Sequence, residues 1–325
     1  MEIHGFRPAS CTKHKLGLFA LVMFTLAHLS DVHLGPLPPI TWHQLLSKRF
    51  TGYANWKLNR EHTHQGEVLS GLIDHIKQRS PDHIALTGDI INLGLNDEIA
   101  NARAWLEAFG PPQQVSLVCG NHDAYVPGSL EQAFENWQPY LSGDDGSPIK
   151  SALDYPVVRR RGKISFILCN SACATPVFFA TGCFDRHQTD GLAKILDQEV
   201  AQRQCRVILI HHPPVDGQTR FQKRLVGAQY FRNAVKKSGA ELILHGHTHV
   251  DSLAKIEGPN GSVPVLGVPA GGQSPGGKRT AARYNLLSIE DEGDKKWDIS
   301  QQQYGYGEDF TGIKKIGETR LISES

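Results

Sequence analysis

Five polar clusters, each at the end of a short apolar run, constrain this chain more than any other feature. In chain order they are Asp31-x-His33, Gly88-Asp89, Gly120-Asn121-His122-Asp123, His211-His212 and Gly246-His247-x-His249. Two side chains at positions i and i+2 beyond a strand end face one pocket. Carboxylate, amide and imidazole groups suit divalent manganese, iron or zinc. A single His-x-His is common in cores and on surfaces, but five such clusters in order predict one metal site.

Alternating periodicities place these clusters in an α/β domain. Short apolar runs predict buried strands at Phe24–Leu29, His83–Leu86, Val115–Val118, Ile164–Leu168, Val207–Ile210 and Leu242–Leu244. Helical spacing predicts helices between them, at Gly66–Arg79, Asp97–Phe109, Ser129–Tyr140, Gln188–Gln202 and Ala228–Ser238. After residue 250 the pattern indicates only strands and turns, with strands at Asp251–Glu257, Val263–Val268, Arg283–Glu290 and Trp297–Tyr304.

Charge and cysteine usage narrow the class of partner. The 325 residues carry 34 Lys and Arg against 33 Asp and Glu, so the net charge of +1 argues against a basic nucleic-acid surface. The sixteen histidines are an unusual number, and histidine is the commonest metal ligand. Several of the six cysteines lie inside apolar runs, which is typical of free thiols in a reducing compartment. We therefore expect a cytoplasmic protein whose partner is not nucleic acid.

The N-terminus imitates a signal peptide. Lys13 and Lys15 precede an apolar run over residues 16–27, which is too short to span a bilayer. The run leads directly into Asp31, so cleavage near Ala27 would remove the strand that presents the first cluster. We therefore predict no membrane span, and we predict that residues 1–22 form a dispensable extension.

With all five clusters intact, the chain resembles the calcineurin-like metallophosphoesterase superfamily over about residues 23–300. The block His211-His212-Pro213-Pro214 resembles the bacterial class III cyclic-nucleotide phosphodiesterases. The resemblance implies an α/β, four-layer fold, in which a β-sandwich of two mixed sheets is flanked by helices. We expect the phosphoesterase domain to span residues 23–305, with an insertion at 35–65 and a C-terminal tail at 306–325.

The same resemblance implies a two-metal site. Carried over to this sequence, it gives one ion the ligands Asp31, His33, Asp89 and His249, and the other ion Asp89, Asn121, His211 and His247. His122 would act on the leaving group, and Asp123 would orient His122. Manganese or a mixed iron–manganese pair is the expected cofactor, with zinc as an alternative.

The charge balance of this set suits phosphate chemistry. Two neighbouring cations need a shared anionic ligand, which Asp89 and a bridging hydroxide provide. Two divalent ions, two carboxylates and one hydroxide leave a net positive charge that attracts a phosphate anion. Neutral Asn121 keeps that balance positive, because a third carboxylate at this position would cancel the charge. A hydroxide of this kind attacks phosphorus in line, without a covalent enzyme intermediate.

The sequence motifs define the residues that bind substrate less clearly than the metal ligands. The insertion mixes aromatic and basic side chains, among them Arg49 and Trp56, and Arg224 lies in a second basic loop. His212 is expected to line the cleft or to support the ligands. The insertion is equally suited to packing on the sandwich edge.

We predict hydrolysis of phosphate esters, with phosphodiesters favoured. The alternatives are phosphomonoesters, nucleoside diphosphate conjugates and phospholipid head groups. Scaffolds of this superfamily typically lose the histidine that His122 matches, so we expect an enzyme. Its partner is expected to be a small molecule rather than nucleic acid, and a homodimer is one possible assembly.

Overall fold

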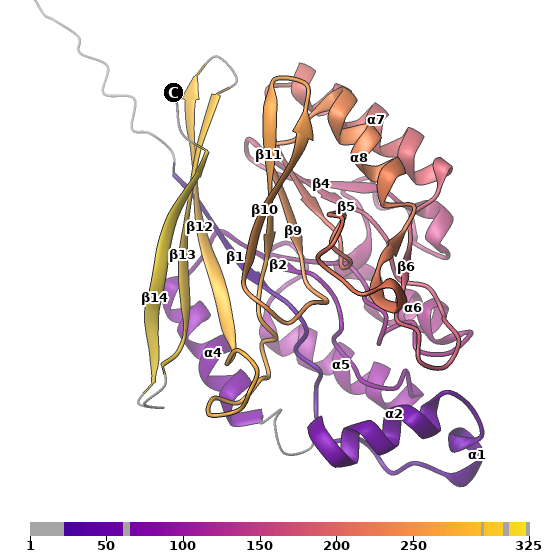
Figure 1. Cartoon of the computed structure of the whole chain (residues 1–325). Coiled ribbons are helices and arrows are strands. Elements are labelled where there is room, and N and C mark those ends of the chain that lie inside the picture. Colours follow the sequence, from indigo (N-terminus) through magenta and orange to yellow (C-terminus); the bar gives the residue numbers. More distant parts are fainter. Residues whose placement is uncertain (1–22, 61–65, 294–295, 308–311, 323–325) are drawn as a thin grey trace, which may run out of the picture.

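The computed structural model describes residues 23–60, 66–293, 296–307 and 312–322, which form one sandwich of two sheets (Figure 1). The predicted extension at residues 1–22 lies outside the described residues. Among the described residues, no helix combines the length and the apolar character needed to cross a membrane.

The first sheet has the strand order β14-β13-β12-β1-β2-β3. Its parallel half consists of β1 (Phe24–Leu29), β2 (His83–Leu86) and β3 (Val115–Leu117). An antiparallel meander completes it, with β12 (Arg283–Gly293), β13 (Lys296–Tyr306) and β14 (Ile313–Ile322). The sheet is therefore mixed, as expected.

The second sheet has the order β10-β11-β9-β7-β5-β4. Four of its strands are parallel, namely β5 (Ile164–Leu168), β7 (Cys205–Leu209), β9 (Leu242–His245) and β11 (Gly261–Gly267). The antiparallel edges are β4 (Val157–Arg161) and β10 (Ser252–Gly258). A small parallel pair, β6 (Gly182–Cys183) with β8 (Leu225–Val226), lies apart from both sheets.

Helices cover the outer faces of both sheets. The first sheet packs against α4 (Gly66–Arg79), α5 (Asn96–Phe109) and α6 (Ser129–Leu141). The second sheet packs against α7 (Arg186–Ala201) and α8 (Ala228–Ser238), on the right of Figure 1. Two 3₁₀ turns, η2 (Ala152–Asp154) and η3 (Phe221–Lys223), lie in connecting loops. The four-layer α/β prediction is confirmed.

The apolar strands fill two cores because their side chains alternate. In β5, Ile164, Phe166 and Leu168 point into the core between the sheets, whereas Ile167 packs with the helices α7 and α8. A strand buried on both faces needs an unbroken apolar run, which is the pattern seen in the sequence. The five cysteines of the described residues are free thiols, in agreement with the composition.

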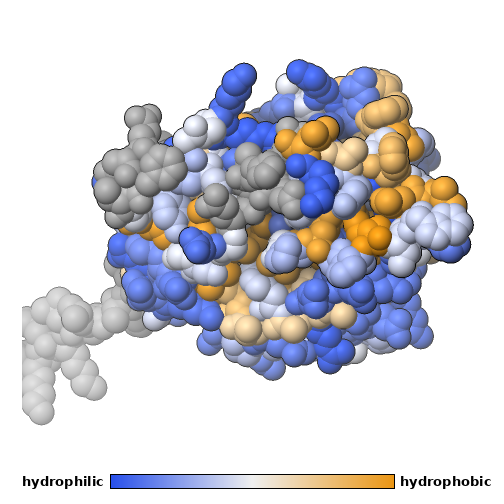
Figure 2. Space-filling model, turned by 90° about the horizontal axis from the view of Figure 1, so that it is seen from below, coloured by the Kyte–Doolittle hydropathy of each residue, from blue (hydrophilic) through white to orange (hydrophobic). Residues whose placement is uncertain are grey.

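The insertion is a short helical arm. It comprises α1 (Trp42–Leu45), α2 (Arg49–Asn55) and the π-helix η1 (Trp56–Arg60). The arm lies below the sandwich, on the right of Figure 1. Figure 2, which views the molecule from below, shows apolar side chains gathered on the right of this face. Trp42, Leu46 and Phe50 are among the exposed apolar residues of this arm.

The expected tail at 306–325 needs correction. Residues 313–322 form β14, which pairs with β13 along most of its length. Its side chains are mostly exposed, and Leu321 is the buried apolar residue. An exposed edge strand is held to the sheet mainly by backbone hydrogen bonds. Its sequence therefore shows little of the apolar pattern by which buried strands are predicted.

Candidate metal centre

Seven polar residues from both sheets meet at the carboxyl ends of the strands. Asp31 and His33 follow β1, Asp89 follows β2 and Asn121 follows β3, whereas His211 follows β7 and His247 and His249 follow β9. All are buried except His249, which is half-buried. The structure thus brings together every residue that the sequence predicted as a ligand, and we call this set the metal centre.

The backbone of the metal centre is strained. Five of its residues have a positive φ: Asp31 (52°), His33 (45°), Asp89 (54°), His247 (67°) and His249 (57°). Residues with a Cβ rarely adopt this left-handed conformation, which costs about 1–3 kcal/mol each. Such strain persists only where the surrounding fold enforces it, and here it turns the side chains toward one point.

Glycines allow these turns to approach one another. At Gly88, where φ is 98°, a Cβ would lie 2.6 Å from His211 Nδ1 and 2.7 Å from the Gly120 backbone nitrogen. At Gly120, a Cβ would lie 2.6 Å from the Asp89 backbone nitrogen. Neither contact is tolerable, so close packing of the loops after β2 and β3 requires glycine at both positions.

One half of the metal centre is built from Asp31, His33, Asp89 and His249, whose ligand atoms lie within 4.8 Å of one another. His249 Nε2 is 3.0 Å from Asp31 Oδ1, and His33 Nε2 is 3.9 Å from Asp89 Oδ2. Asp31 Oδ1 is fully buried, and apart from the His249 ring nitrogen it has no hydrogen-bond partner among the described residues. A buried carboxylate oxygen whose one neighbour is the ring nitrogen of another predicted ligand fits a cation at this point.

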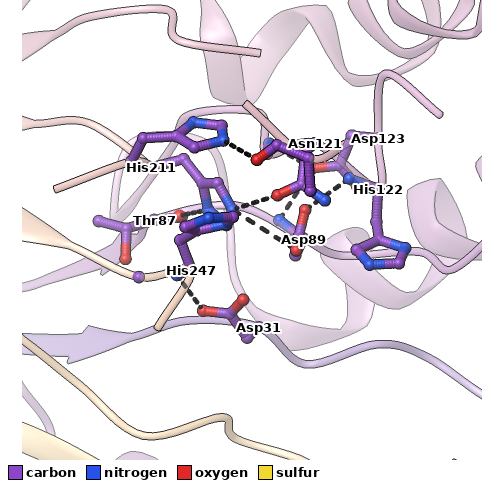
Figure 3. Close-up of polar contacts among 12 residues, drawn as sticks. Asp31, Thr87, Asp89, Asn121, His122, Asp123, His211 and His247 are labelled. Atoms are coloured by element: carbon purple, nitrogen blue, oxygen red, sulfur yellow. Dashed lines mark hydrogen bonds and ion pairs between the residues drawn. The ribbon is translucent and has the colours of Figure 1, made fainter. Parts of the chain in front are cut away.

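The other half is built around His211. Its Nε2 lies 3.4 Å from Asp89 Oδ2 and 3.3 Å from Asn121 Oδ1, while its Nδ1 donates to the Thr87 carbonyl oxygen at 2.6 Å (Figure 3). His247 Nε2 donates to the Lys223 carbonyl oxygen at 2.9 Å. In each ring, a carbonyl oxygen holds one nitrogen and leaves the other as the ligand atom, which is the arrangement of metal-binding histidines.

The charges of the metal centre compensate one another. Burial opposes ionisation of Asp31 and Asp89, but His249 and His211 hold the pKa of Asp31 far below its usual range and His211 lowers the pKa of Asp89 to about 2. Burial disfavours a charged His211, yet Asp89 raises its pKa to about 9. A bound cation would take the place of the proton on His211 as the positive partner of the two carboxylates.

His122 stands beside the metal centre. Its Nδ1 donates to the Asn92 carbonyl oxygen at 2.6 Å, and its backbone nitrogen donates to Asp89 Oδ1 at 2.7 Å. Its ring stacks on Tyr125 with the centroids 5.4 Å apart, and it lies on the opposite side of Asp89 from His211 (Figure 3). Glu98 braces the Asn92 loop, because its carboxylate accepts the backbone N–H groups of residues 92, 93 and 95.

The expected role of Asp123 is wrong. Its carboxylate accepts four backbone N–H groups, from Asp89, Ile90, Ile91 and Gly120, at 2.8–3.2 Å. In the described part of the chain, these backbone groups, and not the His122 side chain, are the hydrogen-bond partners of the Asp123 carboxylate. Asp123 therefore holds the loop after β2 against the turn after β3, and the Asn92 carbonyl oxygen orients His122 instead.

The four residues predicted to bind substrate do not reach the cavity. His212 is buried, with Nδ1 2.9 Å from Ser171 Oγ and Nε2 3.3 Å from the Ala180 carbonyl oxygen. Arg49 donates to the carbonyl oxygens of residues 93 and 94 and so anchors the arm. Trp56 is buried in the arm, and Arg224 stacks on Phe221. Only the supporting role of His212 agrees with expectation.

A cavity of about 710 Å³ opens over the metal centre. Its wall includes Asp89, Asn121, His122, His247 and His249. It also includes residues that were not among the predicted site residues, notably Lys48, Thr51, Tyr125, Phe178, Lys223, Lys278 and Arg279. Lys48 and Lys223 are direct neighbours of the mispredicted Arg49 and Arg224. The composition of the two loops indicated basic walls, but only the loop conformation decides which basic residue faces inward.

Two carboxylates and four imidazoles converge at the strand ends of a mixed β-sandwich, an arrangement typical of metal-dependent hydrolases. The chain belongs to the calcineurin-like phosphoesterase family, whose model matches residues 24–251. The metal centre lies entirely within the matched segment.

Similar proteins agree with this assignment. A probable cyclic nucleotide phosphodiesterase of Synechococcus sp. is 24% identical over 233 residues, which cover 69% of this chain and 78% of that protein. A dimetal phosphatase from Danio rerio shares the fold with a TM-score of 0.56 at 13% identity, covering 92% of this chain and 98% of that one. A purple acid phosphatase from yellow lupin (Lupinus luteus) seeds also has a TM-score of 0.56, at 12% identity, covering 91% of this chain and 53% of that one. The family match makes the protein a hydrolase of phosphate esters.

Proposed function

We propose that the protein hydrolyses phosphodiesters at a two-metal site. Asp31, His33, Asp89 and His249 would hold one ion, and Asp89, Asn121, His211 and His247 the other. The position of Asp89 carries this proposal: its Oδ2 lies 3.9 Å from His33 Nε2 and 3.4 Å from His211 Nε2. One carboxylate thus reaches both halves of the metal centre, as a shared ligand must.

The chain positions the reacting groups. When bound, the two ions supply Lewis acidity toward the phosphate and toward the attacking water. His122 Nε2 donates a proton to the departing oxygen, since Nδ1 is held by the Asn92 carbonyl oxygen. The Asp89 carboxylate fixes the His122 backbone, which sets the distance between the acid and the metal centre.

The remaining predictions belong to the same proposal. The ions are manganese or an iron–manganese pair, with zinc as the alternative, and the substrate is a small molecule rather than nucleic acid. The likeness to a probable cyclic nucleotide phosphodiesterase supports a diester over a monoester. A cytoplasmic location and a homodimer remain predictions.

A substrate panel with manganese-reconstituted protein tests the proposal. We expect a higher kcat/KM for bis(4-nitrophenyl) phosphate and cyclic nucleotides than for 4-nitrophenyl phosphate. Asp89→Asn should abolish turnover of all of them, because it removes the shared ligand. A clear preference for the monoester would replace the proposal with a phosphomonoesterase, and the Asp89→Asn variant excludes a contaminating enzyme.

A further inference from the structure

Lys48 is a half-buried ammonium on the wall of the cavity. It precedes α2 on the arm, and its Nζ donates to Thr175 Oγ1 at 2.7 Å and to the Phe179 carbonyl oxygen at 2.9 Å. The same Nζ lies 4.8 Å from the centroid of the Tyr125 ring. Two acceptors from the segment opposite the arm therefore fix the charge in one place.

Asp89 acts on Lys48 only from a distance, so the ammonium has no carboxylate paired with it. Within the described residues, no carboxylate lies within the 4.0 Å of Nζ that defines an ion pair, whereas Arg206, Arg232 and Lys163 each pair with one. Burial lowers the pKa of Lys48 to about 8, which reflects the cost of its position. An ammonium held by neutral acceptors and facing a cavity is suited to an anionic ligand.

Tyr125 places this charge on one side of the metal centre. Its ring stacks on His122, with the centroids 5.4 Å apart, and contacts the Lys48 ammonium. Because His122 is the proposed proton donor, the side of His122 is the side on which the leaving group departs. Lys278 and Arg279 line the same cavity and add to its positive potential.

Building on the proposed function, we propose that Lys48 binds a second anionic group, a carboxylate or a phosphate, carried by the leaving portion of the phosphodiester. The substrate class is then a diester whose released alcohol is itself an anion. The ammonium contributes a charge-assisted hydrogen bond to that anion. Lys48 is a specificity residue, and the reaction at phosphorus is unchanged by it.

Two diesters that differ only in this charge test the inference. Methyl 4-(carboxymethyl)phenyl phosphate and methyl 4-(carbamoylmethyl)phenyl phosphate have nearly equal size, and the methylene group insulates the phenol from the charge. For the wild type we expect kcat/KM to favour the carboxylate by about 10–100-fold, the range typical of a hydrogen bond to a charged group. Lys48→Gln should lower that preference to within about threefold, mainly through KM, while Lys48→Arg should retain part of it.

Lys57→Gln is the matched control. It removes one positive charge from the same arm, but its Nζ lies over the Trp56 ring at 5.2 Å and it does not line the cavity. Its preference for the carboxylate diester should equal that of the wild type.

Equal losses of kcat/KM on both diesters in Lys48→Gln would show that Lys48 contacts the scissile phosphate and would overturn the inference. If Lys48→Gln does not fold, the wild type alone tests the inference. Equal kcat/KM values of the wild type for the two diesters would overturn it. Failure of the wild type to hydrolyse either diester would instead contradict the proposed function.

Discussion

His122 concentrates the proposed acid chemistry in a single ring nitrogen. We expect His122→Asn to cost little with 4-nitrophenyl esters, because nitrophenolate departs without a proton. With alkyl or ribosyl esters it should lower kcat/KM by about 10²–10⁴-fold, which is typical of lost acid–base catalysis. Metal content should stay near that of the wild type, because the metal centre does not include His122. Equal losses with both ester types, or loss of an ion, would place His122 in metal or substrate binding.

A second residue, His83 at the start of β2, makes the fold sensitive to acid. His83 opens β2, is buried, and bonds Ser116 Oγ at 2.8 Å. Burial, aided by Arg161 and Arg159, lowers its pKa from 6.5 to about 2. Below pH 6.5, His83 is therefore protonated in the unfolded chain but stays neutral in the folded chain. Because the unfolded state binds more protons, the free energy of unfolding decreases as the pH falls.

The His83→Gln variant tests this linkage. Between pH 7 and pH 5, the wild type should lose about 2 kcal/mol more unfolding free energy than the variant, since one pKa unit corresponds to about 1.4 kcal/mol. Urea unfolding at both pH values measures the difference. Parallel losses in the two proteins would mean that His83 exchanges its proton equally in the folded and unfolded states.

Between elements, the loops after β2 and β3 are joined through one carboxylate. Each oxygen of Asp123 accepts two of the four N–H groups described above. In Asp123→Asn one oxygen becomes an NH₂ group, which leaves two buried N–H groups facing a donor. We expect a loss of about 2–5 kcal/mol of stability and weaker metal binding, because Asp89 shifts with its loop.

Thermal unfolding and metal analysis measure this effect, with Asp145→Asn as the control. Asp145 is exposed and accepts the Ser147 N–H at 3.1 Å in a surface loop, so its substitution should have little effect. If Asp123→Asn kept its stability and its metals but reproduced the leaving-group dependence of His122→Asn, the orienting role first expected from the sequence would be restored.

Across the whole molecule, the metal centre joins the two sheets. Asp31, Asp89 and Asn121 come from the first sheet, and His211 and His247 from the second. Bound ions therefore act as a cross-link between sheets as well as a cofactor. Chelation should abolish hydrolysis and also lower Tm, since an ion at a hundred times its Kd stabilises the fold by about 2.7 kcal/mol per site.

Calorimetry before and after chelation, followed by addition of manganese, checks this prediction. Tm and activity should fall together and recover together. Full activity in metal-stripped protein would contradict the two-metal site, and an unchanged Tm would show that the sheets pack equally well without the ions.

Local pattern was sufficient for most of the elements and for the polar clusters that meet at the metal centre. The structure reproduces the predicted bounds of α4 and α8, because an amphipathic face with end signals is encoded within the segment itself. The polar clusters could also be read from the sequence, since each follows a recognisable strand and parallel strand ends meet at one edge. The choice of ligands within the clusters came from the family resemblance and stays a prediction.

Only the tertiary structure decided which partner each polar side chain takes. Asp123 is next to His122 in the chain, yet it turns inward to the backbone of another loop. Lys48 faces the cavity while the adjacent Arg49 bonds carbonyl oxygens behind it. The edge strand β14 was missed for a related reason: its place depends on hydrogen bonds to β13 and hardly on its own side chains. Sequence periodicity reports what a segment buries, whereas these contacts depend on backbone conformations and on segments distant in the chain.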